Sequence, residues 1–138
     1  MTKARLAAAL TVALVAASCG GPTPPSQNTM DSFSGSVQPG NIGPVHTFSV
    51  PNLGEITVSL TAITPGNTFL GLLYGQLNGN SCGTIQQNVA SSSSLGRTVL
   101  TGQIVLKGTY CVLAFDPINL VGSGLTVAQN YTIQVSHP

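Results

Sequence analysis

The stretch Glu55-Ile56-Thr57-Val58-Ser59-Leu60-Thr61-Ala62-Ile63 decides the fold class of this chain. Its apolar side chains alternate with hydroxyl-bearing ones: Ile56, Val58, Leu60 and Ala62 against Thr57, Ser59 and Thr61. A period of two places the two sets on opposite faces of a β-strand. Residues 131–136 repeat the pattern, with Tyr131, Ile133 and Val135 against Thr132, Gln134 and Ser136. The sequence therefore predicts antiparallel strands with one buried and one solvated face.

Two apolar runs without alternation, residues 69–74 and 110–115, are typical of central strands that are covered on both faces. Turn signals separate the strands every 12 to 14 residues: Pro39-Gly40-Asn41, Pro51-Asn52-Leu53-Gly54, Pro65-Gly66-Asn67 and Asn78-Gly79-Asn80. No segment beyond residue 30 shows helical periodicity longer than a turn or two. We predict one all-β domain over residues 31–138, a small antiparallel β-sandwich of jelly-roll or immunoglobulin-like size.

The N-terminus has the three parts of a secretory signal. Lys3 and Arg5 precede an apolar run over residues 6–17, and small residues lead to Cys19. Twelve apolar residues form a helix of about 18 Å, which is too short for a hydrocarbon core of about 30 Å. We therefore predict a cleaved signal peptide over residues 1–18 and not a membrane span.

Two kinds of cleavage before Cys19 fit these residues. Ala16 and Ser18 are small enough for an ordinary secretory cut, whereas Ala16-Ala17-Ser18-Cys19 resembles the lipobox of bacterial lipoproteins. That resemblance implies two or three acyl chains, palmitate among them, on Cys19. Gly20 after the cysteine then implies the outer membrane, in an organism that has one. The larger aliphatic residue usual three places before the cysteine is Ala16 here.

The cysteine count favours lipidation. Three cysteines leave one unpaired in an oxidising compartment. If Cys19 carries lipid, Cys82 and Cys111 remain as a pair, and we expect a disulfide between them. Residues 19–30 contain glycines, prolines and small polar residues, a composition typical of a flexible tether.

Charge is sparse in the exported part of the chain. Five charged side chains follow residue 18: Asp31, Glu55, Arg97, Lys107 and Asp116. Two cations and three carboxylates give a net charge of −1, so no basic face exists for nucleic-acid phosphates. Abundant apolar residues also exclude a disordered chain.

A family resemblance covers most of residues 32–136. Gly108-Thr109-Tyr110-Cys111-Val112 and residues 130–135 are similar to the final two strands of the bacterial pre-peptidase C-terminal domain. Residues 33–37 and 45–50 are similar to its opening strands. The resemblance implies a small β-sandwich that accompanies secreted proteins. The chain lacks the aspartates often found in that family's middle strands, so no calcium site is carried over.

One motif suggests an enzyme. Gly79-Asn80-Ser81-Cys82-Gly83 matches the G-x-S-x-G nucleophile elbow, and Asp116 and His137 follow in the order of an α/β-hydrolase triad. That elbow needs a strand followed by a helix, whereas Asn78-Gly79 is typical of a hairpin turn. His137 stands one residue from the chain end, where we expect nothing to hold its ring.

A metal site could draw on His46 and His137 with Asp116 or Glu55. Two histidines ninety-one positions apart have no ligand spacing, so we expect no metal and no other cofactor.

We therefore expect a lipid-anchored accessory or binding module of the cell envelope, without catalytic activity, that takes a glycan or a protein partner on a neutral face. A structural surface lipoprotein that associates with its own copies is the alternative, because sparse charge leaves edge strands unguarded. A serine hydrolase that uses Ser81 is a third.

Overall fold

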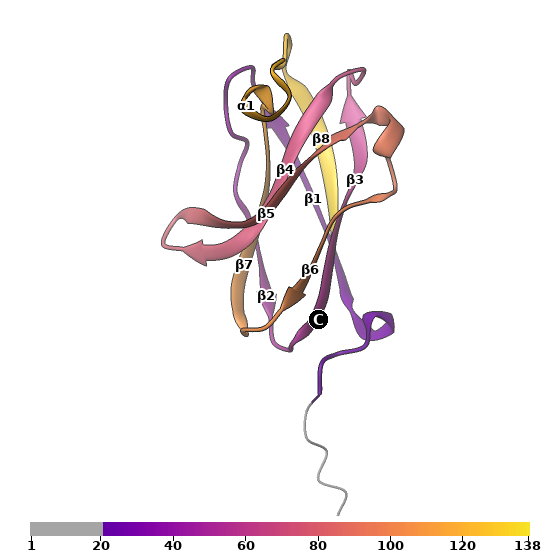
Figure 1. The fold of residues 1–138 in the computed structure, drawn as a ribbon, viewed down its shortest axis with the longest axis vertical. Coiled ribbons are helices and arrows are strands. Elements are labelled where there is room, and N and C mark those ends of the chain that lie inside the picture. The colour runs from indigo at the N-terminus through magenta and orange to yellow at the C-terminus, as the bar shows by residue number, and fades with distance from the viewer. Residues whose placement is uncertain (1–20) are drawn as a thin grey trace, which may run out of the picture.

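A computed structural model describes residues 21–138, in which eight strands form two antiparallel sheets packed face to face (Figure 1). Sheet A has the order β1 (Thr29–Val37), β8 (Gln129–His137), β3 (Gly54–Thr64) and β6 (Thr98–Ile104). Sheet B has the order β2 (His46–Val50), β7 (Gly108–Phe115), β4 (Phe69–Asn78) and β5 (Ser81–Ser91). Short helical turns are η1 (Pro25–Gln27), η2 (Ser92–Ser94) and α1 (Ile118–Val121).

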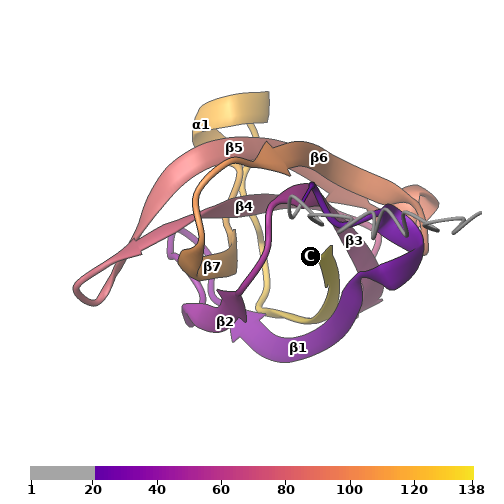
Figure 2. The same ribbon diagram turned by 90° about the horizontal axis from the view of Figure 1, so that it is seen from below.

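The strand pairing is that of a jelly roll. The first strand pairs with the last, and the pairs β2–β7, β3–β6 and β4–β5 continue the same nesting inward. Viewed from below, β1 and β2 lie at one side of the sandwich and β5 and β6 at the other (Figure 2). Asn88 of β5 donates its Nδ2 to the carbonyl of Val99 in β6 at 3.3 Å and so links the two sheets there. The predicted all-β sandwich is confirmed.

The alternation in the deciding stretch is confirmed over its first half and wrong at its end. Ile56, Val58 and Leu60 are fully buried between the sheets. Ala62 is exposed instead of buried, because the pairing of β3 with β8 shifts register between Leu60 and Ala62. The irregularity reverses the faces, and Ile63 packs against the core in place of Ala62.

Both apolar runs form central strands, as predicted. β4 lies between β7 and β5, and β7 lies between β2 and β4. Their inward side chains join the main core: Leu70, Leu72, Tyr74, Tyr110, Val112 and Ala114. Leu73, Cys111 and Leu113 point to the other face of sheet B and are buried as well. All four predicted turns connect consecutive strands.

The N-terminal boundary of the ordered domain differs from the expected one. Residues 1–18, Cys19 and Gly20 lie outside the described residues. The flexible tether expected up to residue 30 is too long, since Thr23 already donates its backbone N–H to the carbonyl of Leu53 at 2.6 Å. Asn28 donates its Nδ2 to the carbonyl of Glu55 at 2.9 Å, and β1 begins at Thr29. Backbone and amide hydrogen bonds hold this segment, and hydrophobic periodicity does not reveal such bonds.

Among residues 21–138, no helix has the length and apolarity needed to cross a membrane.

Candidate functional site

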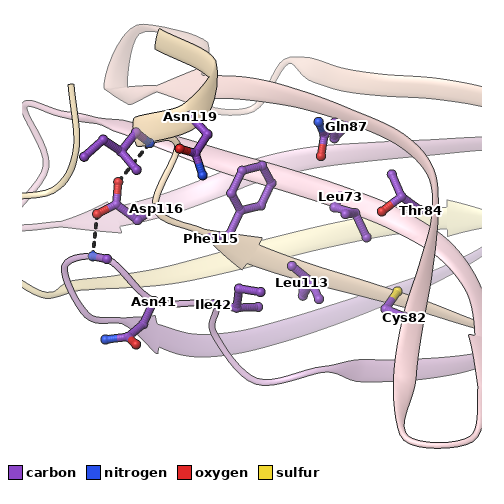
Figure 3. Close-up of a pocket in the computed structure, with 12 residues that line it drawn as sticks. Asn41, Ile42, Leu73, Cys82, Thr84, Gln87, Leu113, Phe115, Asp116 and Asn119 are labelled. Atoms are coloured by element: carbon purple, nitrogen blue, oxygen red, sulfur yellow. Dashed lines mark hydrogen bonds between the residues drawn. The ribbon is translucent and has the colours of Figure 1, made fainter. Parts of the chain in front are cut away.

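A groove of about 390 Å³ lies on the outer face of sheet B, beside α1 (Figure 3). The β1–β2 loop, the two central strands, β5 and the start of α1 all contribute to it. Its lining is Gly40, Asn41, Ile42, Leu73, Cys82, Thr84, Gln87, Leu113, Phe115, Asp116, Ile118 and Asn119. A volume of this size falls in the range of small-ligand sites in proteins.

The floor of the groove is apolar and comes from the two central strands. Leu73 of β4 and Leu113 of β7 are cross-strand neighbours. Phe115 lies opposite Gly71, and a Cβ added to Gly71 would overlap the Phe115 ring. The aromatic ring therefore rests on bare glycine backbone. Because Gly71 has no side chain, the Phe115 ring lies closer to the sheet and the floor of the groove is deeper.

Strand β5 forms one wall of the groove, and it bends at a bulge in its pairing with β4. The β4–β5 register shifts between Tyr74 and Gly75, and a Cβ added to Gly75 would collide with the carbonyl of Gly83. A bulge of this kind bends a strand and redirects its side chains. Gln87 pairs with Leu73 before the shift and Thr84 pairs with Gly75 after it, so the bulge places Thr84 on the same face as Gln87, and both line the groove.

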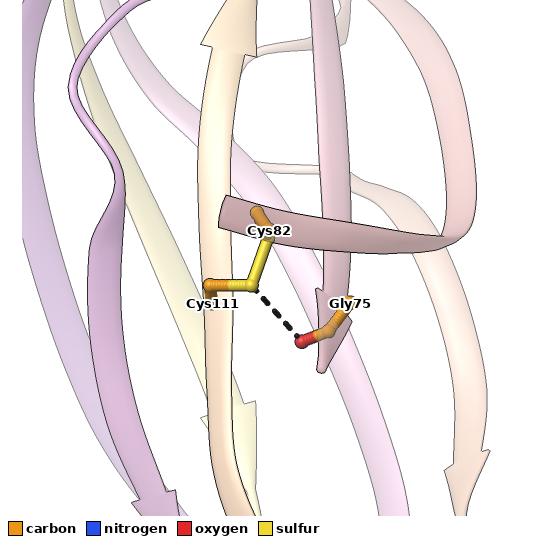
Figure 4. Close-up of a disulfide and its surroundings, with 3 residues drawn as sticks. All are labelled: Gly75, Cys82 and Cys111. Carbon is orange, nitrogen blue, oxygen red and sulfur yellow. Dashed lines mark hydrogen bonds between the residues drawn. A yellow bond between two sulfur atoms is a disulfide. The ribbon is translucent and has the colours of Figure 1, made fainter. Parts of the chain in front are cut away.

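The predicted disulfide between Cys82 and Cys111 is confirmed, with 5.7 Å between the two Cα atoms. It joins the start of β5 to β7 across the intervening strand β4 (Figure 4). Cys111 Sγ lies 3.3 Å from the carbonyl oxygen of Gly75, the residue at the bulge. The bond therefore holds the bent strand in place over the central strands.

Asp116 holds the opposite wall. Its carboxylate accepts backbone N–H groups from Gly40 at 2.6 Å, Ile118 at 3.1 Å and Leu125 at 3.1 Å. These donors belong to the β1–β2 loop, α1 and the loop before β8, and Figure 3 draws the bonds to the first two. The backbone N–H of Asp116 in turn donates to the carbonyl of Asn41 at 3.0 Å. One buried carboxyl group thus joins two loops and α1 and positions Ile42 and Asn119 at the rim.

The groove is electrically almost neutral. Asp116 is its charged residue, and backbone donors occupy both of its oxygens. The remaining polar side chains of the lining are uncharged: Asn41, Thr84, Gln87 and Asn119. Among the described residues 21–138, no lysine or arginine lines this groove. An apolar floor with amide and hydroxyl groups around it suits a ligand that is uncharged and rich in hydrogen-bonding groups.

The residues of the hypothetical triad are held by other partners. Ser81 lies beside the β4–β5 turn, where it pairs with Asn78. Asp116 is bonded to backbone amides at the end of β7, whereas His137 Nε2 lies 3.0 Å from Asp31 Oδ2. Within residues 21–138, no hydrogen bond joins any two of the three.

The expectation that nothing holds the His137 ring is wrong. The ring is buried at the end of β8 and packs on Phe48, with 4.8 Å between ring centroids. The sequence contained a signal for this position. His137 has the same parity as Tyr131, Ile133 and Val135, so the period of two places it on the buried face of β8.

The two histidines are also separated as potential metal ligands. His46 Nε2 lies 3.1 Å from the Tyr131 hydroxyl, and its ring stacks on Phe33. Burial lowers the pKa of His46 below its usual 6.5. The described residues contain no group of three or more His, Cys, Asp or Glu side chains placed to hold a metal ion.

No protein-family model and no curated protein matches this chain.

Proposed function

We propose that this protein is a lipid-anchored, non-catalytic module of the bacterial cell envelope that binds an uncharged glycan in the groove on sheet B. The observation that carries the proposal is the composition of that groove. Leu73, Leu113 and Phe115 form an apolar floor, and uncharged amide and hydroxyl side chains surround it.

Sugar rings have the chemistry that this surface complements. A pyranose ring has an apolar C–H face that packs on an aromatic ring, and hydroxyl groups at its edge that both donate and accept hydrogen bonds. Asn41, Gln87 and Asn119 also both donate and accept. An anionic ligand would need a cation that the lining lacks, and the Asp116 carboxylate would repel it.

The anchor rests on the sequence. Lys3 and Arg5, the short apolar run and the lipobox-like Ala16-Ala17-Ser18-Cys19 support export and acylation of the cysteine. The disulfide is consistent with an oxidising compartment, because such bonds rarely persist in the cytosol. Gly20 supports the outer membrane as the destination in an organism with two membranes. The resemblance to the pre-peptidase C-terminal domain also suggests an accessory role beside secreted proteins.

Two neighbouring glutamines on β5 give a matched test. Gln87 lines the groove, whereas Gln86 is also exposed but does not line it. The detergent-solubilised mature lipoprotein is screened on an array of neutral glycans, and binders are titrated by calorimetry. Gln87→Ala should weaken binding by about five-fold, the worth of one hydrogen bond, and Gln86→Ala should not. An array without binders, or equal losses in both variants, would contradict glycan binding at this groove.

One observation favours the alternative of self-association. β5 is an edge strand of eleven residues without a charged side chain, and residues 83–88 are exposed along it. Long uncharged edges offer unpaired backbone groups to a second copy. Sedimentation equilibrium of the same detergent-solubilised protein tests this alternative, since a monomer at high concentration would contradict it.

A further inference from the structure

Two connecting loops and the N-terminal segment meet at one end of the sandwich, which we call the base (Figures 1 and 2). The β2–β3 loop, residues 51–53, starts after Val50, and the β6–β7 loop, residues 105–107, ends before Gly108, which pairs with Val50. Ile104 pairs with Gly54, and Gly54 forms a parallel bridge with Thr23. Thr23, Gly54 and Ile104 therefore lie side by side. The segment that follows Cys19 joins the domain next to the end of β6, where the β6–β7 loop begins.

The β6–β7 loop exposes two aliphatic side chains beside a cation. Val105 is 72% exposed and Leu106 is 60% exposed, and Lys107, which follows them, is exposed as well. The loop is fixed in this position, because the Tyr110 hydroxyl donates to the carbonyl of Leu106 at 2.8 Å. Two adjacent exposed aliphatic side chains beside a lysine, on a loop held in place, have the composition of a contact with a membrane surface.

The length of chain between Cys19 and the domain limits how far the base can stand from the membrane. Thr23 is bonded to Leu53, so four residue intervals separate this fixed point from the acylated cysteine. Fully extended, they reach about 14 Å. The headgroup layer alone is about 5–8 Å thick on each side of the hydrocarbon core. The base therefore lies at the membrane surface even when the connection is stretched.

We propose that the β6–β7 loop rests in the lipid headgroup layer, with Val105 and Leu106 inserted and Lys107 paired with anionic lipid phosphates. This inference rests on the acylation of Cys19 stated under Proposed function. Lys107 is one of two cations in residues 21–138, and the other, Arg97, lies in the β5–β6 connection. A lysine near an anionic membrane surface contributes attraction that falls off within a Debye length.

The two carboxylates near the base lie on β1 and β3 and not in the β6–β7 loop. Asp31 is paired with His137, and Glu55 is half-buried at the start of β3, beside the amide-bonded Asn28. The resulting orientation presents the groove outward. β7 runs from Gly108 at the base to Phe115 at the groove, and seven strand intervals cover about 23 Å.

The chain contains no tryptophan, so a single introduced tryptophan reports its own surroundings. Leu106→Trp is compared with Val127→Trp, a position 51% exposed between α1 and β8 at the opposite end. Both are prepared as the full lipidated protein in phosphatidylglycerol–phosphatidylethanolamine vesicles with brominated acyl chains. For Leu106→Trp we expect blue-shifted emission and loss of most of its intensity relative to unbrominated vesicles. For Val127→Trp we expect neither change.

Val105→Trp gives a second reporter on the same loop and should behave as Leu106→Trp does. Equal, unquenched emission from the loop and from position 127 in protein that floats with the vesicles would overturn the inference. A blue shift without lipid quenching that grows with protein density would assign the loop to a second copy and would overturn it too. Intact-mass analysis separates the two proposals. An unmodified Cys19 refutes the anchor itself, whereas an acylated Cys19 with an unquenched loop refutes only the contact.

Discussion

His137 Nε2 lies 3.0 Å from Asp31 Oδ2, across the pairing of the last strand with the first. The two residues are diagonal neighbours, since His137 is in register with Thr29 and Asp31 with Val135. The imidazole is buried against Phe48, which belongs to the other sheet. The penultimate residue of the chain therefore joins both sheets at the base and closes the jelly roll.

Removal of this side chain should destabilise the fold. His137→Ala loses a hydrogen bond to a carboxylate and the packing on Phe48, and we expect a loss of about 2–3 kcal/mol in the free energy of unfolding. Urea denaturation followed by circular dichroism measures it. Gln134→Ala, on the outer face of the same strand, is the control and should cost less than about 1 kcal/mol. A double-mutant cycle with Asp31→Ala that shows no coupling would contradict the pairing.

Asp116 should be one of the most sensitive positions outside the core. Asp116→Ala leaves the backbone N–H groups of Gly40, Ile118 and Leu125 without their acceptor, and we expect a loss of about 2–4 kcal/mol. Asp116→Asn keeps one acceptor oxygen and should lose less. Thermal unfolding measures both. A matched change at Asp31, whose carboxylate is bonded to one partner, should cost less than Asp116→Ala.

The disulfide should stabilise both the fold and the groove wall. The closed loop spans 29 positions, for which the chain-entropy model gives about 3–4 kcal/mol. The variant Cys82→Ser with Cys111→Ser should unfold at correspondingly lower urea concentration and exchange the amide hydrogens at the start of β5 faster. Equal exchange rates in both proteins would show that the bond does not hold the bent strand.

The sequence predicts the layers of this fold better than its details. Alternation identifies β3 and β8, and apolar runs identify the two central strands. A strand buried on one face alternates apolar and polar residues, whereas a strand buried on both faces is apolar throughout. Ala62 is assigned to the wrong face, because a bulge depends on pairing between distant strands. The groove is beyond such reasoning. Asn41, Gln87 and Asn119 come from three separate elements that lie together only in the folded structure.

Gly71 offers a direct test of how the floor is built. A methyl group at this position would overlap the Phe115 ring, so Gly71→Ala must displace the ring from the groove floor. We expect a loss of stability of about 1–3 kcal/mol, typical of overpacking, together with weaker glycan binding. Gly21→Ala is the control, since a Cβ there meets no atom within 4 Å. Unchanged affinity in a folded Gly71→Ala protein would contradict a role for Phe115 in binding.

His46 should make stability depend on pH. Burial lowers the pKa of His46 from 6.5 and raises that of Tyr131 to about 12, so the uncharged ring and a protonated hydroxyl meet at 3.1 Å. Because the unfolded chain takes up the imidazole proton at a higher pH than the folded chain does, stability falls as pH drops below about 6.5. The loss levels off below the pKa of the folded protein. His46→Gln lacks this titration, and its urea midpoint should therefore fall less than that of the wild type between about pH 7.5 and about pH 5. Parallel pH profiles for the two proteins would show that His46 binds its proton equally well folded and unfolded.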